Sequence, residues 1–273
     1  MSSQRPRIDL VASPRNASDL ILFAHGGLAD STDDPHAWRG PILRMWPFAA
    51  AAKQVDRSAL VGLIRYRYRG WNGTAADPSA DLRLVLDRLP AQISRVVLIG
   101  HSMGGRAVVA QGNHPKVVGV LGQAPWLPEE EPSPWHPPQE PAANSTGDSI
   151  GDLAGGPAGG PIVFAHGDQD RITDPALTAA FADRLRLAGI PVAVLRVEGE
   201  QHAMLHRATD WTELVRRFIR HTLGPGDTFL KETVTTELSR SDPLPRWARP
   251  GAITTGVLET ARGRLTQRIT GHL

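Results

Sequence analysis

A glycine-serine-glycine turn directly after an apolar run is the feature that most constrains how this chain folds. The run covers residues 95–99 and leads at once into Gly100-His-Ser102-Met-Gly104. A strand that turns immediately into a helix holds the central serine in a strained backbone conformation, which persists mainly where the strain has a use. Side chains at Gly100 and Gly104 would collide with neighbouring backbone. We therefore expect the Ser102 hydroxyl to project from the carboxyl end of a strand, with the next helix pointing at it.

Short apolar runs alternate with helical patterns over most of the chain. Continuously apolar strands that alternate with helices indicate a mostly parallel sheet with helices on both faces, so the expected fold class is α/β. Ligands bind such sheets beyond the carboxyl ends of their strands. The expected strands cover residues 20–24, 59–66, 95–99, 117–121, 161–165 and 191–197, with an extended piece at 8–11, and the expected helices cover 36–55, 77–89, 103–112, 174–188 and 207–223.

Polar motifs follow three further strands. Residues 166–170 read His-Gly-Asp-Gln-Asp directly after one apolar run, and residues 198–204 place His202 directly after another. Near the start, residues 25–27 read His-Gly-Gly after the expected strand at 20–24, which suits a loop that exposes backbone N–H groups. The order along the chain is serine, aspartate, histidine. Four such motifs, each directly after an expected strand, would rarely coincide by chance. Together they predict one site at one edge of the sheet.

Over residues 18–223 the chain resembles the serine α/β-hydrolases, and it reproduces their strand and helix order. The resemblance implies that Ser102 is the nucleophile, Asp170 the acid and His202 the base of a catalytic triad. Asp168 is the alternative acid, but the H-G-x-x-D spacing of the family favours Asp170. His206 is the alternative base, although it falls in the following helix.

The resemblance also implies an oxyanion hole and a substrate pocket. The backbone N–H of Met103 is the first expected donor, and that of Gly27 is the second, with Leu28 as its alternative. Leu28, Trp71 and Trp126 follow strands and are expected to line the pocket, although the two tryptophans would equally suit ordinary packing at the sheet edge. His25 and His166 are expected to form hydrogen bonds within their loops, and His101 is expected to be a buried, hydrogen-bonded residue without a catalytic role.

The chemistry that follows is cleavage of a carboxylic ester or thioester of a small-molecule acyl substrate, through an acyl-enzyme on Ser102. A serine at this position argues against relatives that need a carboxylate nucleophile. Two other functions share the fold: acyl transfer to an acceptor other than water by the same triad, and binding without turnover. No cofactor is expected, and the remaining histidines lack the spacing of metal ligands, so no metal site is expected.

Two regions depart from the family pattern. Residues 125–160 contain eight prolines, six glycines and six acidic residues but no lysine or arginine. This composition predicts a lid or surface loop without helices, over an open or partly covered site, with Trp126 and Trp135 as its apolar contacts. Residues 224–273 are expected to follow the domain at 1–223 as an extension. From residue 256 they form a basic amphipathic pattern that would dock on the domain, on a second copy in a homo-oligomer, or on an anionic membrane.

Composition excludes several other classes of protein. The hydrophobic fraction of 41% supports one substantial core, and the absence of cysteine excludes disulfides and thiolate metal sites. The net charge of +2 comes from basic residues scattered among acidic ones, so nucleic-acid binding is not expected. The first residues lack the apolar core of a secretion signal, and no apolar run approaches the roughly 20 residues that span a membrane. A cytoplasmic location is therefore expected.

Overall fold

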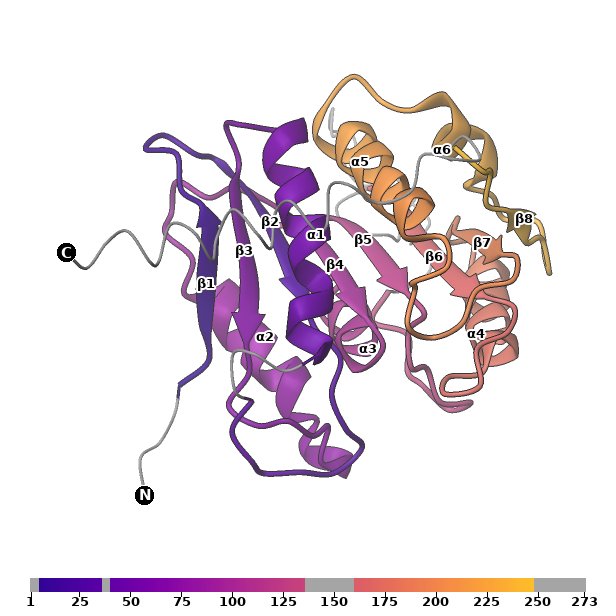
Figure 1. Ribbon diagram of the computed structural model, residues 1–273, viewed down its shortest axis with the longest axis horizontal. Coiled ribbons are helices and arrows are strands. Elements are labelled where there is room, and N and C mark those ends of the chain that lie inside the picture. The colour runs from indigo at the N-terminus through magenta and orange to yellow at the C-terminus, as the bar shows by residue number, and fades with distance from the viewer. Residues whose placement is uncertain (1–4, 36–39, 136–159, 248–273) are drawn as a thin grey trace, which may run out of the picture.

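An eight-stranded sheet forms the centre of the molecule (Figure 1). The computed structural model describes residues 5–35, 40–135 and 160–247. The strand order is β1-β3-β2-β4-β5-β6-β7-β8, and only β1 runs antiparallel to its neighbour. The strands are β1 (Arg7–Ala12), β2 (Asp19–Ala24), β3 (Leu60–Arg65), β4 (Arg95–His101), β5 (Val117–Gln123), β6 (Ile162–Gly167), β7 (Ala193–Val197) and β8 (Asp242–Pro243).

Helices cover both faces of this sheet, which confirms the predicted α/β class. Figure 1 shows α1 and α5 crossing one face, and α2, α3 and α4 pack on the other. Within the described ranges, no helix is long and apolar enough to cross a membrane. The helices are α1 (Gly40–Val55), α2 (Asp77–Asp87), α3 (Met103–Ala110), α4 (Pro175–Leu187), α5 (Ala208–Leu223) and α6 (Thr228–Thr233), with a short 3₁₀ turn at Gly73–Ala75.

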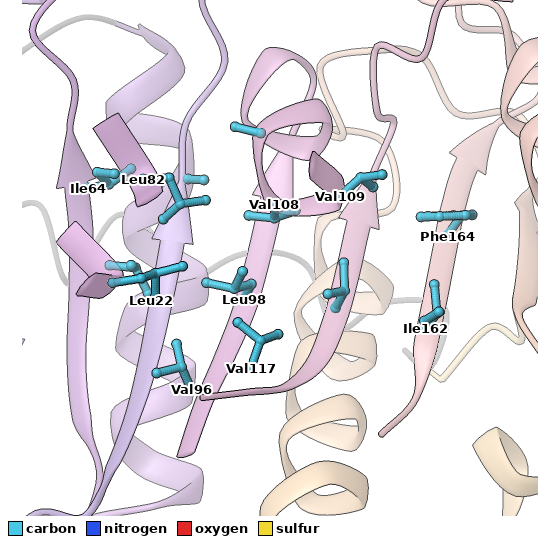
Figure 2. Close-up of a cluster of buried hydrophobic side chains, with 14 of the residues drawn as sticks. Leu22, Ile64, Leu82, Val96, Leu98, Val108, Val109, Val117, Ile162 and Phe164 are labelled. Atoms are coloured by element: carbon cyan, nitrogen blue, oxygen red, sulfur yellow. The ribbon is translucent and has the colours of Figure 1, made fainter. Parts of the chain in front are cut away.

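Continuous burial explains why the strands read as apolar runs. Every residue of β2 and of β6 is buried, as expected for parallel strands that are covered on both faces. Figure 2 shows the core on one face, where Leu22 and Leu98 of the sheet lie among side chains of the covering helices, such as Leu82 and Val108. A second core, on the other face, includes Trp211 and Phe218 of α5.

The register of the central strands aligns the loops that carry the polar motifs. Ala24 at the end of β2 pairs with Gly100 near the end of β4. His101 pairs with Gln123, the last residue of β5. The loops after these three strands therefore begin side by side at the carboxyl edge of the sheet, where the serine turn lies.

The chain continues past α5 on the same sheet. α6 packs on the sheet face that α1 and α5 cover, and β8 pairs with β7 at the sheet edge. Neither element was expected from the sequence. The basic amphipathic pattern from residue 256 lies outside the described residues, as does 136–159 of the loop at 125–160. Residues 125–135 of that loop contain neither helix nor strand.

Candidate active site

The turn between β4 and α3 has the strained geometry that its glycines predict. Ser102 has φ 58° and ψ −122°, a conformation that few residues other than glycine adopt. A side chain at Gly104 would overlap the backbone of Ala24 and His25 at the end of β2. The close approach of α3 to β2 therefore depends on glycine there. The turn raises the serine hydroxyl above the carboxyl edge of the sheet.

Three side chains from three loops meet at this turn. The Ser102 hydroxyl lies 3.0 Å from Nε2 of His202, so it can donate its proton to the imidazole. Nδ1 of the same ring lies 2.8 Å from Oδ2 of Asp170 and donates to it. This bond sets the tautomer that leaves Nε2 free to accept the serine proton. The serine follows β4, the aspartate follows β6 and the histidine follows β7.

The Asp170 carboxylate accepts hydrogen bonds from several donors besides His202. The backbone N–H groups of Ile172 and Thr173 donate to Oδ1 at 2.8 and 3.0 Å. The Thr173 hydroxyl and Nε2 of His166 reach Oδ2 at 2.9 and 3.1 Å. Burial alone would raise the pKa of Asp170, but these bonds together hold it well below its usual range. The carboxylate is therefore ionised throughout the neutral range.

Two groups hold the loop that carries the candidate base. The buried Glu200 carboxylate accepts from the backbone N–H of Arg207 at 2.7 Å and from Nε1 of Trp211 at 3.2 Å, which fastens the loop to the start of α5. Nε2 of His101 donates to the backbone oxygen of His202 at 3.0 Å, and the two imidazole rings lie 4.7 Å apart. These contacts fix the position of the His202 ring relative to Ser102.

The alternative acid and base lie apart from the serine. The exposed Asp168 accepts from the backbone N–H of Gly199 at 2.8 Å. His206 has a side chain that is 61% exposed, and its Nδ1 lies 3.4 Å from Oε1 of Glu200. Neither residue forms a hydrogen bond or an ion pair with Ser102 or His202 in the described part of the chain. The geometry favours Asp170 and His202 over both alternatives.

The expected oxyanion donors lie on either side of the serine. Met103 is the first residue of α3, so its N–H has no acceptor within the helix. A side chain at Gly27 would overlap the side chain of Met103 and the Arg69 carbonyl, so the loop after β2 packs directly on the start of α3. The N–H of Leu28 donates to the Arg69 carbonyl at 2.9 Å. Because that donor is engaged, the geometry favours Gly27 over Leu28.

The two predicted pocket tryptophans belong to a cluster around Arg106 of α3. Trp71 and Trp126 make an edge-to-face pair with ring centres 6.3 Å apart. The Arg106 guanidinium lies 3.9 Å from the Trp71 ring centre and 4.8 Å from that of Trp126. Its Nε donates to the buried carboxylate of Glu131 at 2.7 Å. The backbone N–H of Trp126 donates to the Ser102 carbonyl at 3.1 Å, so the cluster joins the loop after β5 to the serine turn.

Two cavities flank the triad. The smaller, about 210 Å³, lies along the loop after β2, between Gly27 and Leu28 on one side and Pro41 and Ile42 of α1 on the other. Leu28 thus lines a cavity next to the candidate oxyanion loop, as its predicted pocket role requires. The larger, about 750 Å³, lies on the histidine side and is lined by Arg44, Asp168, Gln169, Asp170, Arg171, Ile172, Gln201, His202 and Ala203.

Sequence reasoning missed several residues that shape the site. Thr173 touches both Asp170 and His202, and its place three residues after the aspartate, where a hydroxyl can complete a turn, was the available signal. Glu200 lies two residues before His202, and its complete burial is not visible in the sequence. Nothing in the pattern of residues 36–55 marks Arg44, which is brought beside His202 only by packing of α1.

No group of three or more histidine, aspartate or glutamate side chains within the described ranges is arranged to hold a metal ion. The histidines near Ser102 are instead engaged with protein partners. His25 donates to the Gly26 carbonyl at 2.7 Å, and Nδ1 of His166 lies 2.9 Å from the Thr178 hydroxyl. Burial lowers the pKa of His25 to about 4, so its ring is neutral at physiological pH. The predicted hydrogen bonds of His25 and His166 within their loops are confirmed, and His101 is buried and hydrogen-bonded as predicted, with the distant His202 as its partner.

A nucleophile turn, a Ser-His-Asp chain and a mostly parallel sheet with helices on both faces together define an α/β-hydrolase. Residues 21–261 match the model of the Alpha/beta hydrolase family, and the chain belongs to that family. None of the curated proteins matches the sequence.

Solved structures of other members share the fold. An α/β serine hydrolase without a lid from Xanthomonas campestris aligns with TM-score 0.50 and 18% identity, over 81% of this chain and 90% of its own. A putative α/β-hydrolase of unknown function from Agrobacterium tumefaciens aligns with TM-score 0.55 and 14% identity, over 84% and 93%. A butyrate-bound thermophilic esterase from Thermogutta terrifontis aligns with TM-score 0.54 and 16% identity, over 78% and 88%. At these identities the likeness concerns the fold alone.

Proposed function

We propose that this protein is a serine hydrolase that cleaves a carboxylic ester or thioester through an acyl-enzyme on Ser102. The observation that carries the proposal is the continuous chain from the Ser102 hydroxyl through His202 to Asp170, with distances of 3.0 and 2.8 Å. Such a chain activates an otherwise weak nucleophile. The esterases among the solved structures of the same fold add support, because they show that the fold accommodates this chemistry.

In the first half of the reaction, Oγ of Ser102 attacks the carbonyl carbon while Nε2 of His202 takes its proton. Asp170 keeps the ring oriented and stabilises its cationic form without accepting the proton. The N–H groups of Met103 and Gly27 donate to the oxyanion of the tetrahedral intermediate. When the intermediate collapses, His202 gives the proton to the departing alcohol or thiol, and the acyl group stays on Ser102.

In the second half, water takes the place of the leaving group. His202 removes a proton from the water, which attacks the acyl-enzyme carbonyl and forms a second oxyanion in the same hole. Collapse of this intermediate releases the carboxylic acid and returns the proton to Oγ of Ser102. Atoms and protons balance within the protein, the substrate and one water molecule.

A fluorophosphonate probe tests the activated nucleophile directly. We expect the probe to label Ser102, as mapped by mass spectrometry, and we expect His202→Ala to reduce the labelling rate by at least about 10³-fold. Ser102→Ala should abolish labelling and the hydrolysis of short-chain esters. Folded protein that is not labelled, or labelling at another residue, would reject the assignment. Product analysis with added alcohols would distinguish hydrolysis from acyl transfer.

A further inference from the structure

Two arginines border the large cavity on the histidine side of the triad, and neither forms an ion pair with another described residue. Arg44 extends from α1, and Arg171 follows Asp170 directly in the loop after β6. The guanidinium of Arg44 makes one long contact, from Nη1 to the His202 carbonyl at 3.5 Å. The side chain of Arg171 is exposed and has no hydrogen-bond partner in the described ranges. Most of the arginines in the described ranges have a carboxylate partner, as Arg106 does.

The surroundings of Arg44 make an unpaired cation costly there. The side chain is partly buried, and this burial lowers the pKa of Arg44, although a guanidinium stays charged at any physiological pH. The buried Glu200 carboxylate attracts Arg44 electrostatically but forms no ion pair with it, so this partly desolvated cation still gains from an anion that enters the cavity and contacts it directly. A guanidinium also presents two parallel N–H groups that suit the paired oxygens of a carboxylate or phosphate.

The position of the cavity indicates which part of a substrate would reach these arginines. His202, Gln201 and Ala203 line it, whereas Ser102 and the candidate oxyanion loop do not. In the proposed reaction the departing alcohol or thiol receives its proton from His202, so the leaving group must lie on this side of the serine. The acyl chain lies away from it. An anion bound at Arg44 would therefore belong to the leaving group.

We propose that Arg44 and Arg171 form a subsite for an anionic group, a carboxylate or a phosphate, on the leaving group of the substrate. The inference rests on the proposed serine hydrolase function and narrows it to esters or thioesters of acidic alcohols or thiols. Arg44 supplies the partly buried contact and Arg171 the exposed one. Neither residue takes part in bond making; both set specificity by binding a part of the substrate that does not react.

One acidic side chain opposes this charge. The exposed Asp168 lines the same cavity, and one of its oxygens is held by the N–H of Gly199. The other lining carboxylate, Asp170, has a side chain with no solvent exposure, and all its donors are internal to the triad loops. The exposed charges that face the cavity are therefore Arg171 and Asp168, and the partly buried Arg44 and the buried, ionised Asp170 also line it. Removing the charge of Asp168 should therefore strengthen anion binding, whereas removing the charge of either arginine should weaken it.

Matched aryl esters test the subsite in turnover. The pair is 4-carboxyphenyl butyrate and its neutral 4-carbamoylphenyl analogue, with a 4-phosphonophenyl ester as the phosphate-like arm. We expect Arg44→Gln to lower the ratio of kcat/KM for the anionic ester to that for the neutral one by about 10- to 100-fold. The ratio cancels differences in intrinsic reactivity and in folding. Arg171→Gln should lower the ratio less, and Asp168→Asn should raise it. Whichever anion gives the larger ratio identifies the preferred group.

Controls separate a subsite from a general charge effect. Arg83→Gln removes a charge from an exposed arginine of α2 that pairs with Asp87, away from the cavity, and should leave the ratio unchanged. Arg44→Lys keeps the charge without the paired N–H groups and should give an intermediate ratio. An ester whose carboxylate lies on the acyl side, phenyl hemisuccinate, should show no such dependence on Arg44. An unchanged ratio in both Arg44→Gln and Arg171→Gln would overturn the proposal.

Equilibrium binding distinguishes failure of the subsite from failure of the proposed function. Ser102→Ala cannot form an acyl-enzyme, so binding of the leaving group alone to this variant, followed by calorimetry, needs no turnover. We expect 4-hydroxybenzoate to bind more tightly than 4-hydroxybenzamide, and the preference to disappear in Ser102→Ala/Arg44→Gln. Equal binding of the two ligands would overturn the subsite even if hydrolysis is observed. A preserved preference without any ester hydrolysis would support the subsite and reject the reaction.

Discussion

At the scale of single residues, hydrogen bonding decides which buried groups of the candidate site are ionised and which are neutral. Asp170 is ionised because backbone and side-chain donors surround it, although it is buried. His101, one residue before the serine, is also buried. Its Nε2 donates one hydrogen bond, to the His202 carbonyl, and its Nδ1 has no hydrogen-bond partner. Burial, and then the neighbouring His202, lower the pKa of His101 to about 3. Its ring is neutral in the folded protein.

This neutral histidine predicts a specific loss of stability in acid. Between its ordinary pKa of 6.5 and about 3, His101 binds a proton in the unfolded chain but not in the folded one, so stability falls as the pH falls. The expected slope for one such group is about 1.4 kcal/mol per pH unit. His101→Gln keeps a donor for the His202 carbonyl and removes the titration. Its free energy of unfolding should therefore decline less steeply than that of the wild type between pH 6 and pH 4, by about that amount.

Urea unfolding at a series of pH values measures the two slopes. Any constant cost of the substitution shifts the whole curve of the variant and does not affect the comparison. Parallel curves for the wild type and His101→Gln over this range would show that the histidine is not held neutral by burial.

At the scale of elements, the beginning of the loop after β5 is fastened to α3. Arg106 joins Trp71, Trp126 and Glu131 in one cluster, and Nη2 of Arg184 in α4 donates to the Glu131 backbone oxygen at 3.0 Å. The buried Trp135 packs at Gly112, two residues past the end of α3. The expected apolar contacts of Trp126 and Trp135 are present. The Arg106–Glu131 ion pair beside them was not predicted from the sequence.

Removing the cation from this cluster should be costly. Arg106→Met would leave the Glu131 carboxylate buried without its hydrogen-bonded ion-pair partner, which we expect to lower the free energy of unfolding by about 3–5 kcal/mol. Arg106→Met/Glu131→Gln removes both charges and should recover a large part of that loss. Arg83→Met breaks a pair whose two side chains are both exposed, and it should have little effect on stability. Equal stability of the single and double variants in urea would contradict the coupling.

At the scale of the whole molecule, the segment after α5 is part of the packed structure. β8 pairs with β7, and Nη2 of the buried Arg207 donates to the Leu244 and Pro245 carbonyls at 2.9 and 2.8 Å. Leu230 of α6 is fully buried in the core on this face, and Leu244 nearly so. These contacts cover an edge of the sheet that would otherwise present unpaired backbone groups.

A single substitution tests how much this segment contributes. Leu230→Ala removes a fully buried side chain and should lower the free energy of unfolding by about 2–5 kcal/mol. Leu238→Ala, in the same segment but 53% exposed, is the matched control and should change it by less than about 0.5 kcal/mol. Urea unfolding of both variants gives the comparison. If Leu230→Ala were as stable as the control, residues 224–247 would not contribute to the fold.

The elements of the central sheet were predictable because buried parallel strands are continuously apolar and lie between amphipathic helices. β8 escaped prediction since it has two residues, Asp242 and Pro243, and neither marks a strand. α6 is also short, with six residues. Such elements form because a neighbouring edge or face is available, which is a property of the folded sheet and not of their own sequence.

The sequence by itself determined the class of fold, the strained serine turn and the residues from which a triad would be drawn, because glycine placement, apolar runs and motif order are local properties. Asp170 and His202 were already favoured over Asp168 and His206 by the family resemblance. The tertiary structure added the contacts that join them to Ser102, and Thr173, Glu200 and Arg44 as their neighbours. Hydrogen bonds and burial depend on which loops meet at the edge of the sheet. Which loops lie together is set by strand order and register, and neither can be read from a short stretch of sequence.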